Sequence, residues 1–230
     1  MIKAIVFDFD GVIVDSEPLH YRAFLRVAQS IGVNFSYDEY VERYIGYDDR
    51  DAFRVMLGQK PGETGGAEIQ SRVTRMVEEK AEAFEAIVNE GIEPIAGVED
   101  FIRSLSGTLP IAIASGATMR DIELVLRRID LRASFGTIVS ADQVARSKPD
   151  PASYAMAVDT LARRWPALKI EPEDCLAIED TAAGIESARG AGLMTIGLST
   201  TGPADKLSRA HRVLPGYEGL SLAQLRAWFD

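Results

Sequence analysis

The stretch Val6-Phe-Asp-Phe-Asp-Gly-Val-Ile-Val-Asp-Ser16 constrains the fold of this 230-residue chain more than any other. Residues 2–7 are mostly apolar, and a short apolar run that ends at a turn signal predicts a buried strand. Asp8 and Asp10 follow at once, before Gly11. Side chains alternate along a strand, so both carboxylates are expected on the same side. Open parallel sheets carry ligand sites past their strand ends, which predicts a polar site here.

The second half of the chain alternates between strand and helix patterns, which predicts an α/β fold with a doubly wound parallel sheet. Apolar runs predict the strands, and amphipathic spacing with turn signals predicts the helices. The expected strands after the first cover 110–114, 137–139, 175–178, 193–198 and 213–214, and the expected helices cover 118–129, 151–164, 181–189 and 220–229.

Only helix patterns occur between the first strand and the second. A crossover between parallel strands usually needs a single helix, so this stretch is too long for a simple connection. We therefore expect two domains. Residues 1–15 and 89–230 would form the α/β core, and residues 16–88 would form an inserted helical cap domain.

Composition narrows the classes of partner. The chain has 25 Lys and Arg against 35 Asp and Glu, a formal net charge of −10, which disfavours nucleic acid as a partner because phosphate backbones require a basic surface. The single cysteine, Cys175, excludes an intrachain disulfide and is expected to be a buried thiol. No apolar run is long enough to span a membrane, and no signal-peptide pattern is seen. We expect a cytoplasmic protein that binds no membrane, as a monomer or small homo-oligomer.

Four groups of polar residues are expected at the carboxyl edge of the predicted sheet. Because residues distant in the sequence converge at that edge, they are expected to form one site. The four groups are Asp8 with Asp10, Ser115-Gly116, Ser147-Lys148-Pro149 and Glu179-Asp180-Thr181.

Together these groups have the parts for phosphoryl chemistry. A hydroxyl and backbone amides at Ser115 and Gly116 can hold phosphate oxygens, and Lys148 can neutralise their charge. Carboxylates suit Mg²⁺, and one of them can attack phosphorus while a second transfers the proton. Each residue also has a purely structural interpretation. Ser115 and Thr181 can be helix N-caps, Lys148 a turn lysine, and Glu179 and Asp180 acids that favour a helix dipole.

The set resembles the four motifs of the haloacid dehalogenase superfamily, in the segments Asp8-Phe-Asp-Gly-Val, Ala114-Ser-Gly, Ser147-Lys-Pro and Ile178-Glu-Asp. The insert resembles the C1 cap of its subfamily I, and the segment Asp15-Ser-Glu-Pro-Leu-His20 resembles the branch that holds β-phosphoglucomutase and sugar-phosphate phosphatases.

The resemblance implies a role for each matching residue. Asp8 would be the nucleophile that forms an aspartyl-phosphate, and Asp10 the general acid and base. Ser115, Gly116 and Lys148 would bind the phosphoryl group. Asp8, the Asp10 carbonyl, Glu179 and Asp180 would hold Mg²⁺.

Asp10 favours a phosphate ester over a haloacid as substrate, because an alkoxide leaving group needs a proton and a halide does not. The expected activity is hydrolysis of a small phosphorylated metabolite, such as a sugar phosphate or phosphoglycolate. The alternative is a mutase of the β-phosphoglucomutase type, which grips a second phosphate with cap cations. Arg50 is offset from that position and follows two acids, while Arg72, Arg75 and Lys80 are further candidates. His20 matches a position near the mutase hinge, and it is also a plausible packing residue.

Two non-hydrolase interpretations remain. A receiver domain phosphorylated on aspartate shares the sheet, the acids and the lysine, but it is about half this length and has no cap. An inactive scaffold that only binds its ligand is the other, although every catalytic position is filled here.

Overall fold

The computed structural model describes residues 1–45, 47–60, 62–63 and 65–229. The chain divides into two compact units, a core of residues 1–15 and 92–230 and a helical unit of residues 16–91. Each unit is described by itself. None of the described helices is long and apolar enough to cross a membrane.

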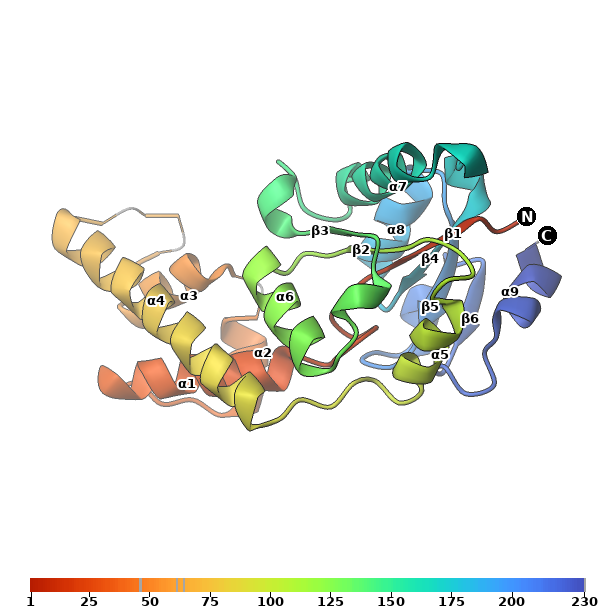
Figure 1. Ribbon diagram of the computed structural model, residues 1–230. Helices are drawn as coiled ribbons and strands as arrows, with labels where there is room; N and C mark the ends of the chain where they lie inside the picture. The colour runs from red at the N-terminus through yellow and green to blue at the C-terminus, as the bar shows by residue number, and fades with distance from the viewer. Residues whose placement is uncertain (46, 61, 64, 230) are drawn as a thin grey trace. The chain divides into compact units, whose positions relative to one another are not determined.

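The core contains one parallel sheet with the strand order β3-β2-β1-β4-β5-β6, which confirms the predicted α/β class (Figure 1). From β1 the chain builds outward to β3 on one side and then to β6 on the other. The chain direction reverses at β1, and open α/β sheets bind ligands at the carboxyl ends of the strands where such a reversal occurs. The strands are β1 (Ala4–Phe7), β2 (Ile111–Ala114), β3 (Thr137–Val139), β4 (Cys175–Glu179), β5 (Met194–Leu198) and β6 (Arg212–Leu214).

Both faces of the sheet are covered by helices (Figure 1), which explains why β1, β2 and β4 are buried at every position and apolar except at Glu179, the last residue of β4. Helices α7 and α8 cover one face (Figure 1), and Val6 packs in a cluster with Tyr154 of α7 and Ala188 of α8. Phe7 points to the opposite face and packs edge-on against Phe101 of α5, with 6.1 Å between ring centroids. The core helices are α5 (Val98–Leu105), α6 (Met119–Arg128), α7 (Ala152–Arg164), α8 (Ala182–Gly190) and α9 (Leu222–Phe229).

Helix α5 is an addition to the sequence prediction, which assigned no helix between 91 and the second strand. Val98, Phe101, Ile102 and Leu105 follow helical spacing and are all buried. The helix begins after Gly97 without a side-chain N-cap, so the sequence lacks the usual signal for the start of a helix.

The helical unit consists of α1 (Glu17–Ser30), α2 (Tyr37–Arg43), α3 (Asp49–Met56) and α4 (Ala67–Glu90). Its own apolar cluster joins Phe24 of α1, Tyr40 of α2, Phe53 of α3 and Val73 of α4. Helix α2 begins at the capping box that Ser36 and Glu39 form, as their spacing predicts. A separate core of this kind allows the insert to pack as a unit.

Candidate active site at the carboxyl edge of the sheet

Asp8 follows β1 directly and is only 7% exposed. Its backbone N–H donates to the carbonyl of Ile178 at 2.9 Å, which continues the pairing of β1 with β4 for one more residue. The chain then turns at Gly11, whose N–H donates to the carbonyl of Val14 at 2.7 Å and whose φ of +71° is readily adopted only by glycine. The half-buried Asp10 lies in the same turn.

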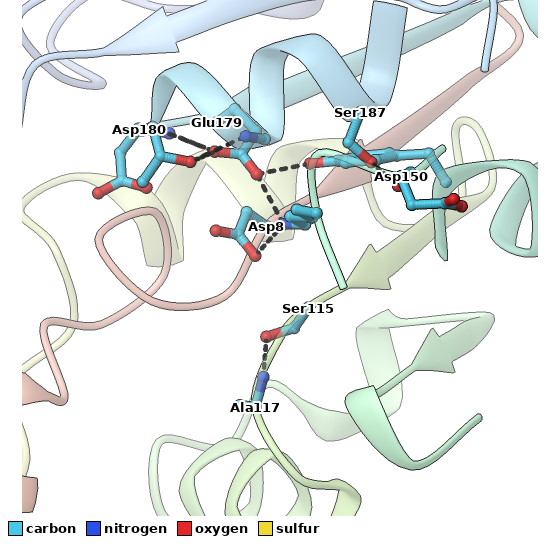
Figure 2. Close-up of polar contacts among 11 residues, drawn as sticks. Asp8, Ser115, Ala117, Asp150, Glu179, Asp180 and Ser187 are labelled. Carbon is cyan, nitrogen blue, oxygen red and sulfur yellow. Dashed lines mark hydrogen bonds and ion pairs between the residues drawn. The ribbon is translucent and has the colours of Figure 1, made fainter. Parts of the chain in front are cut away.

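Lys148 lies between two carboxylates, Asp8 and Glu179, which are 140 and 31 residues away from it in the sequence; Figure 2 shows these two acids. Its ammonium donates to Asp8 Oδ1 at 2.7 Å and to Glu179 Oε1 at 2.6 Å. The loop that carries Lys148 is attached to α8, because the Ser187 hydroxyl donates to the carbonyl of Asp150 at 2.6 Å. The lysine is therefore a fixed part of the site and not an exposed turn residue.

Glu179 is the last residue of β4, is fully buried and accepts hydrogen bonds on both carboxylate oxygens. Oε1 accepts from Lys148 and from the hydroxyl of Tyr154 at 3.1 Å. Oε2 accepts from the N–H groups of Asp180 and Thr181 and from the Thr181 hydroxyl, each at 3.0 Å. Five donors to one carboxylate offset the cost of burying its charge.

Burial and neighbouring charges act in opposite directions on the acids and the lysine. Burial raises the pKa of Asp8 well above its usual range, and Glu179 adds to the rise while Lys148 opposes it. Burial alone would lower the pKa of Lys148, but Asp8 and Glu179 outweigh it and raise that pKa. Lys148 therefore stays protonated, and its charge favours the ionised form of Asp8.

One carboxylate oxygen of Asp180 forms no hydrogen bond within the described part of the chain. Oδ1 is buried and has no hydrogen-bond partner among the described residues. Asp8, Glu179 and Asp180 each place one carboxylate oxygen within 4.8 Å of the others. Burial raises the pKa of Asp180 to about 6. A hard divalent cation such as Mg²⁺ fits this arrangement, because it prefers oxygen ligands and would satisfy the unpaired buried oxygen.

Ser115 and Gly116 follow β2, the neighbour of β1, on the same edge (Figure 2). The buried Ser115 hydroxyl accepts from the N–H of Ala117 at 2.9 Å, so its own hydrogen remains a donor. A Cβ at Gly116 would meet nothing within 4 Å, so its backbone is open to a ligand. Thr118, not Ser115, is the N-cap of α6.

The model of the haloacid dehalogenase-like hydrolase family matches residues 5–198, which include all four polar groups. The chain belongs to this family. The hydrolase is 30% identical over 196 residues to the phosphorylated carbohydrates phosphatase of Thermotoga maritima, a match that covers 85% of this chain and 84% of that protein. It is 29% identical over 205 residues to the β-phosphoglucomutase of Bacillus subtilis, which covers 88% and 85%.

A solved structure of a related protein has a similar fold. The crystal structure of CbbY from Rhodobacter sphaeroides in complex with phosphate superposes with a TM-score of 0.78 at 29% identity and covers 98% of this chain and 100% of that one. The hydrolase thus shares its fold along the whole chain with a phosphate-binding protein.

His20 and Arg50 of the hydrolase belong to the helical unit, whereas the residues described so far belong to the core. His20, on α1, stacks on Phe84 with 4.2 Å between ring centroids, and its Nδ1 is 3.0 Å from the ammonium of Lys80. Lys80 is buried and also forms an ion pair with Asp49 at 3.0 Å. Arg50 is exposed in the first turn of α3. Sequence analysis anticipated Lys80 only as one of several cap cations and did not anticipate its pairing with Asp49.

Three residues of the site have no signal in the sequence. Tyr154 looks like an ordinary core residue of α7, yet its ring lies 5.1 Å from the Lys148 ammonium and its hydroxyl donates to Glu179. Gly184 contacts Glu179 from α8, and Thr201 donates to Asp180 from the loop after β5. Their roles depend on contacts between distant segments, which residue type alone does not reveal.

Proposed function

We propose that this hydrolase is a Mg²⁺-dependent phosphatase that acts on a small phosphate monoester, in the class of sugar phosphates, through a phosphoenzyme at Asp8. The observation that carries the proposal is the contact of Lys148 with both Asp8 and Glu179, beside the unpaired oxygen of Asp180. A carboxylate nucleophile, a fixed cation and a metal-compatible acid are the parts that phosphoryl transfer needs. The names of the similar phosphatase and mutase support a phosphorylated carbohydrate as substrate.

In the first step an oxygen of the Asp8 carboxylate attacks phosphorus, and the ester P–O bond breaks. Asp10 donates its proton to the departing alkoxide oxygen, so the product leaves as an alcohol. Lys148, the Ser115 hydroxyl and the backbone at Gly116 bind the oxygens of the transferring group.

In the second step Asp10, now a carboxylate, removes a proton from water. The water oxygen attacks the phosphorus of the aspartyl-phosphate, the bond to Asp8 breaks, and inorganic phosphate and the free Asp8 carboxylate are formed. Mg²⁺, held by Asp8, the Asp10 carbonyl and Asp180, would neutralise charge on the phosphoryl oxygens. Glu179 would act mainly through Lys148.

The helical unit favours hydrolysis over mutase chemistry. A mutase of the phosphoglucomutase type must hold a second phosphate, which requires an available cation. Of the candidate cations, the buried Lys80 already pairs with Asp49, whose acidic side chain would repel a dianion, and the exposed Arg50 directly follows that same acid. We therefore place the chain with the phosphatases and propose a substrate with a single phosphate.

The decisive experiment measures phosphate release from a panel of sugar phosphates and phosphoglycolate, with Mg²⁺ and with EDTA. We expect metal-dependent release that falls by a factor on the order of 10³ or more in Asp8→Asn. Asp159→Asn, an exposed acid on α7, is the matched control and should retain wild-type turnover.

Wild-type turnover in a folded Asp8→Asn protein would exclude the proposed nucleophile. Conversion of β-glucose 1-phosphate to the 6-phosphate with a bisphosphate primer, without phosphate release, would instead establish the mutase.

A further inference from the structure

The loop after β5 contributes two adjacent threonines that the proposed reaction does not use. The hydroxyl of Thr201 donates to Asp180 Oδ2, and the hydroxyl of Thr200 donates to the carbonyl of Gly11. The loop therefore contacts both the turn after β1 and the acid after β4. These are the two segments that supply the proposed metal ligands.

The two oxygens of Asp180 have different surroundings. Oδ2 is occupied by the Thr201 hydroxyl, whereas Oδ1 is buried without a hydrogen-bond partner in the described part of the chain. Asp180 is 8% exposed, so water has little access to it. A buried carboxylate oxygen without a donor is costly unless a cation satisfies it.

Close packing keeps Asp180 from turning away. A Cβ at Gly11 would lie 1.9 Å from Asp180 Oδ2 and 2.9 Å from Thr201 Cγ2, so these three residues fill the space between the loops. The carboxylate is thus held by a hydrogen bond on one oxygen and by backbone packing at the same end.

Glu179, the neighbouring acid, is already engaged. Lys148, Tyr154, Thr181 and the Asp180 N–H direct five hydrogen bonds at its two oxygens, which uses all the lone-pair directions of a carboxylate. Of the two adjacent acids, only Asp180 has an oxygen to offer a cation without losing an existing bond.

We infer that Thr201 is a positioning residue that holds Asp180 so that Oδ1 faces the divalent cation. The inference rests on the proposed function, which provides the cation. Hydrogen bonds to the far side of a metal ligand fix its orientation, and their removal typically weakens metal binding by about 10- to 100-fold. Thr201 would therefore set metal affinity without contacting metal or substrate.

The test is calorimetric titration of Mg²⁺ into the metal-free 230-residue protein. Thr201→Val keeps the size of the side chain and removes the hydroxyl, and we expect its dissociation constant for Mg²⁺ to rise about 10-fold or more. Thr201→Ser restores the hydroxyl and should recover most of the affinity. Turnover of Thr201→Val should approach the wild-type value when Mg²⁺ is raised to saturation.

Thr160→Val is the control, because the Thr160 hydroxyl donates only to the carbonyl of Met156 within α7, and its Mg²⁺ affinity should match the wild type. Thr201→Ala replaces Thr201→Val if the latter does not fold. Wild-type Mg²⁺ affinity in a folded variant without the hydroxyl would overturn the inference and leave the proposed function intact. A wild-type protein that binds no Mg²⁺ would overturn both.

Discussion

At the scale of single residues, the site is organised by compensation of buried charge. Lys148 is 13% exposed at its side chain and contacts one carboxylate of 10% and another of 0% exposure. Removal of one partner from such a group leaves the others uncompensated, which typically costs about 3–5 kcal/mol. The lysine therefore supports the fold of the site as well as its proposed chemistry.

The environment of His20 predicts that the stability of the protein depends on pH. Burial, and then the charge of Lys80, lower its pKa to about 3 from an ordinary 6.5. The unfolded chain therefore binds a proton between those values that the folded chain does not. The stability contribution of neutral His20 is present above pH 6.5 and is lost as the pH falls, by about 1 kcal/mol between pH 7 and 5.5.

Urea unfolding at several pH values between 5.5 and 7 measures this effect. We expect the free energy of unfolding to depend less on pH in His20→Gln than in wild type, whatever the absolute stability of that variant. His211→Gln, which removes the only other histidine, and Asp180→Asn, which removes the acid with a pKa of about 6, together account for the remaining slope. An identical slope in wild type and His20→Gln would show that folding does not lower the pKa of His20.

At the scale of elements, α8 packs so closely on the end of β4 that one position tolerates only glycine. A Cβ at Gly184 would lie 1.7 Å from Glu179 Oε1, the oxygen that binds Lys148. Alanine is preferred over glycine in a helix by about 1 kcal/mol, so helix propensity alone predicts a stabilised Gly184→Ala. We expect the opposite, a net loss of about 1–3 kcal/mol and at least about a tenfold loss of turnover, because Glu179 must move.

Gly190→Ala is the matched control in the same helix, since its Cβ would meet only Pro151 at an ordinary 3.4 Å. Thermal unfolding and phosphate release, measured on both variants, separate the effect of helix propensity from the effect of packing against Glu179. A Gly184→Ala protein more stable than wild type would show that Glu179 can be displaced without cost.

The elements were predictable where local pattern determines them. Apolar runs predicted the strands of the sheet, and the polar residues at the ends of β1, β2 and β4 predicted a common site, because the carboxyl ends of parallel strands lie at one edge. The structure does bring oxygens of Asp8, Glu179 and Asp180 within 4.8 Å of one another, while the roles of these residues stay predictions. The short helix α5 was missed. Tyr154 was missed for a different reason, since its contact with Glu179 depends on how α7 lies on the sheet and not on any motif.

At the scale of the whole molecule, the strand order β2-β1-β4 places segments that are distant in the sequence next to one another in the sheet. The reversal of chain direction at β1 brings together groups that are separated by 140 residues in the case of Asp8 and Lys148. It also concentrates three carboxylates in a protein whose net charge is already −10. The global fold thus creates a local excess of negative charge that one lysine only partly offsets.

This excess predicts how metal and pH affect global stability. Without a cation, burial raises the pKa of Asp180 to about 6, so the folded core binds a proton that the unfolded chain, with a value near 3.8, releases. That stabilising contribution is complete below pH 3.8 and is lost as the pH rises through 6. At pH 7 in EDTA the core should therefore be destabilised by its own acids, and Asp180→Asn should be more stable than wild type.

In Mg²⁺ at pH 7 we expect wild type to be more stable than Asp180→Asn. The reason is that a ligand that binds only the folded state stabilises it by about 2.7 kcal/mol at a concentration 100 times its dissociation constant. The measurement is urea unfolding of wild type and Asp180→Asn, in EDTA and in Mg²⁺, at equal ionic strength. We expect a large Mg²⁺ effect in wild type and little in the variant, whereas Asp159→Asn, exposed on α7, should respond like wild type. Equal stabilisation of all three proteins would mean that Mg²⁺ acts on surface charge in general and that Asp180 is not its ligand.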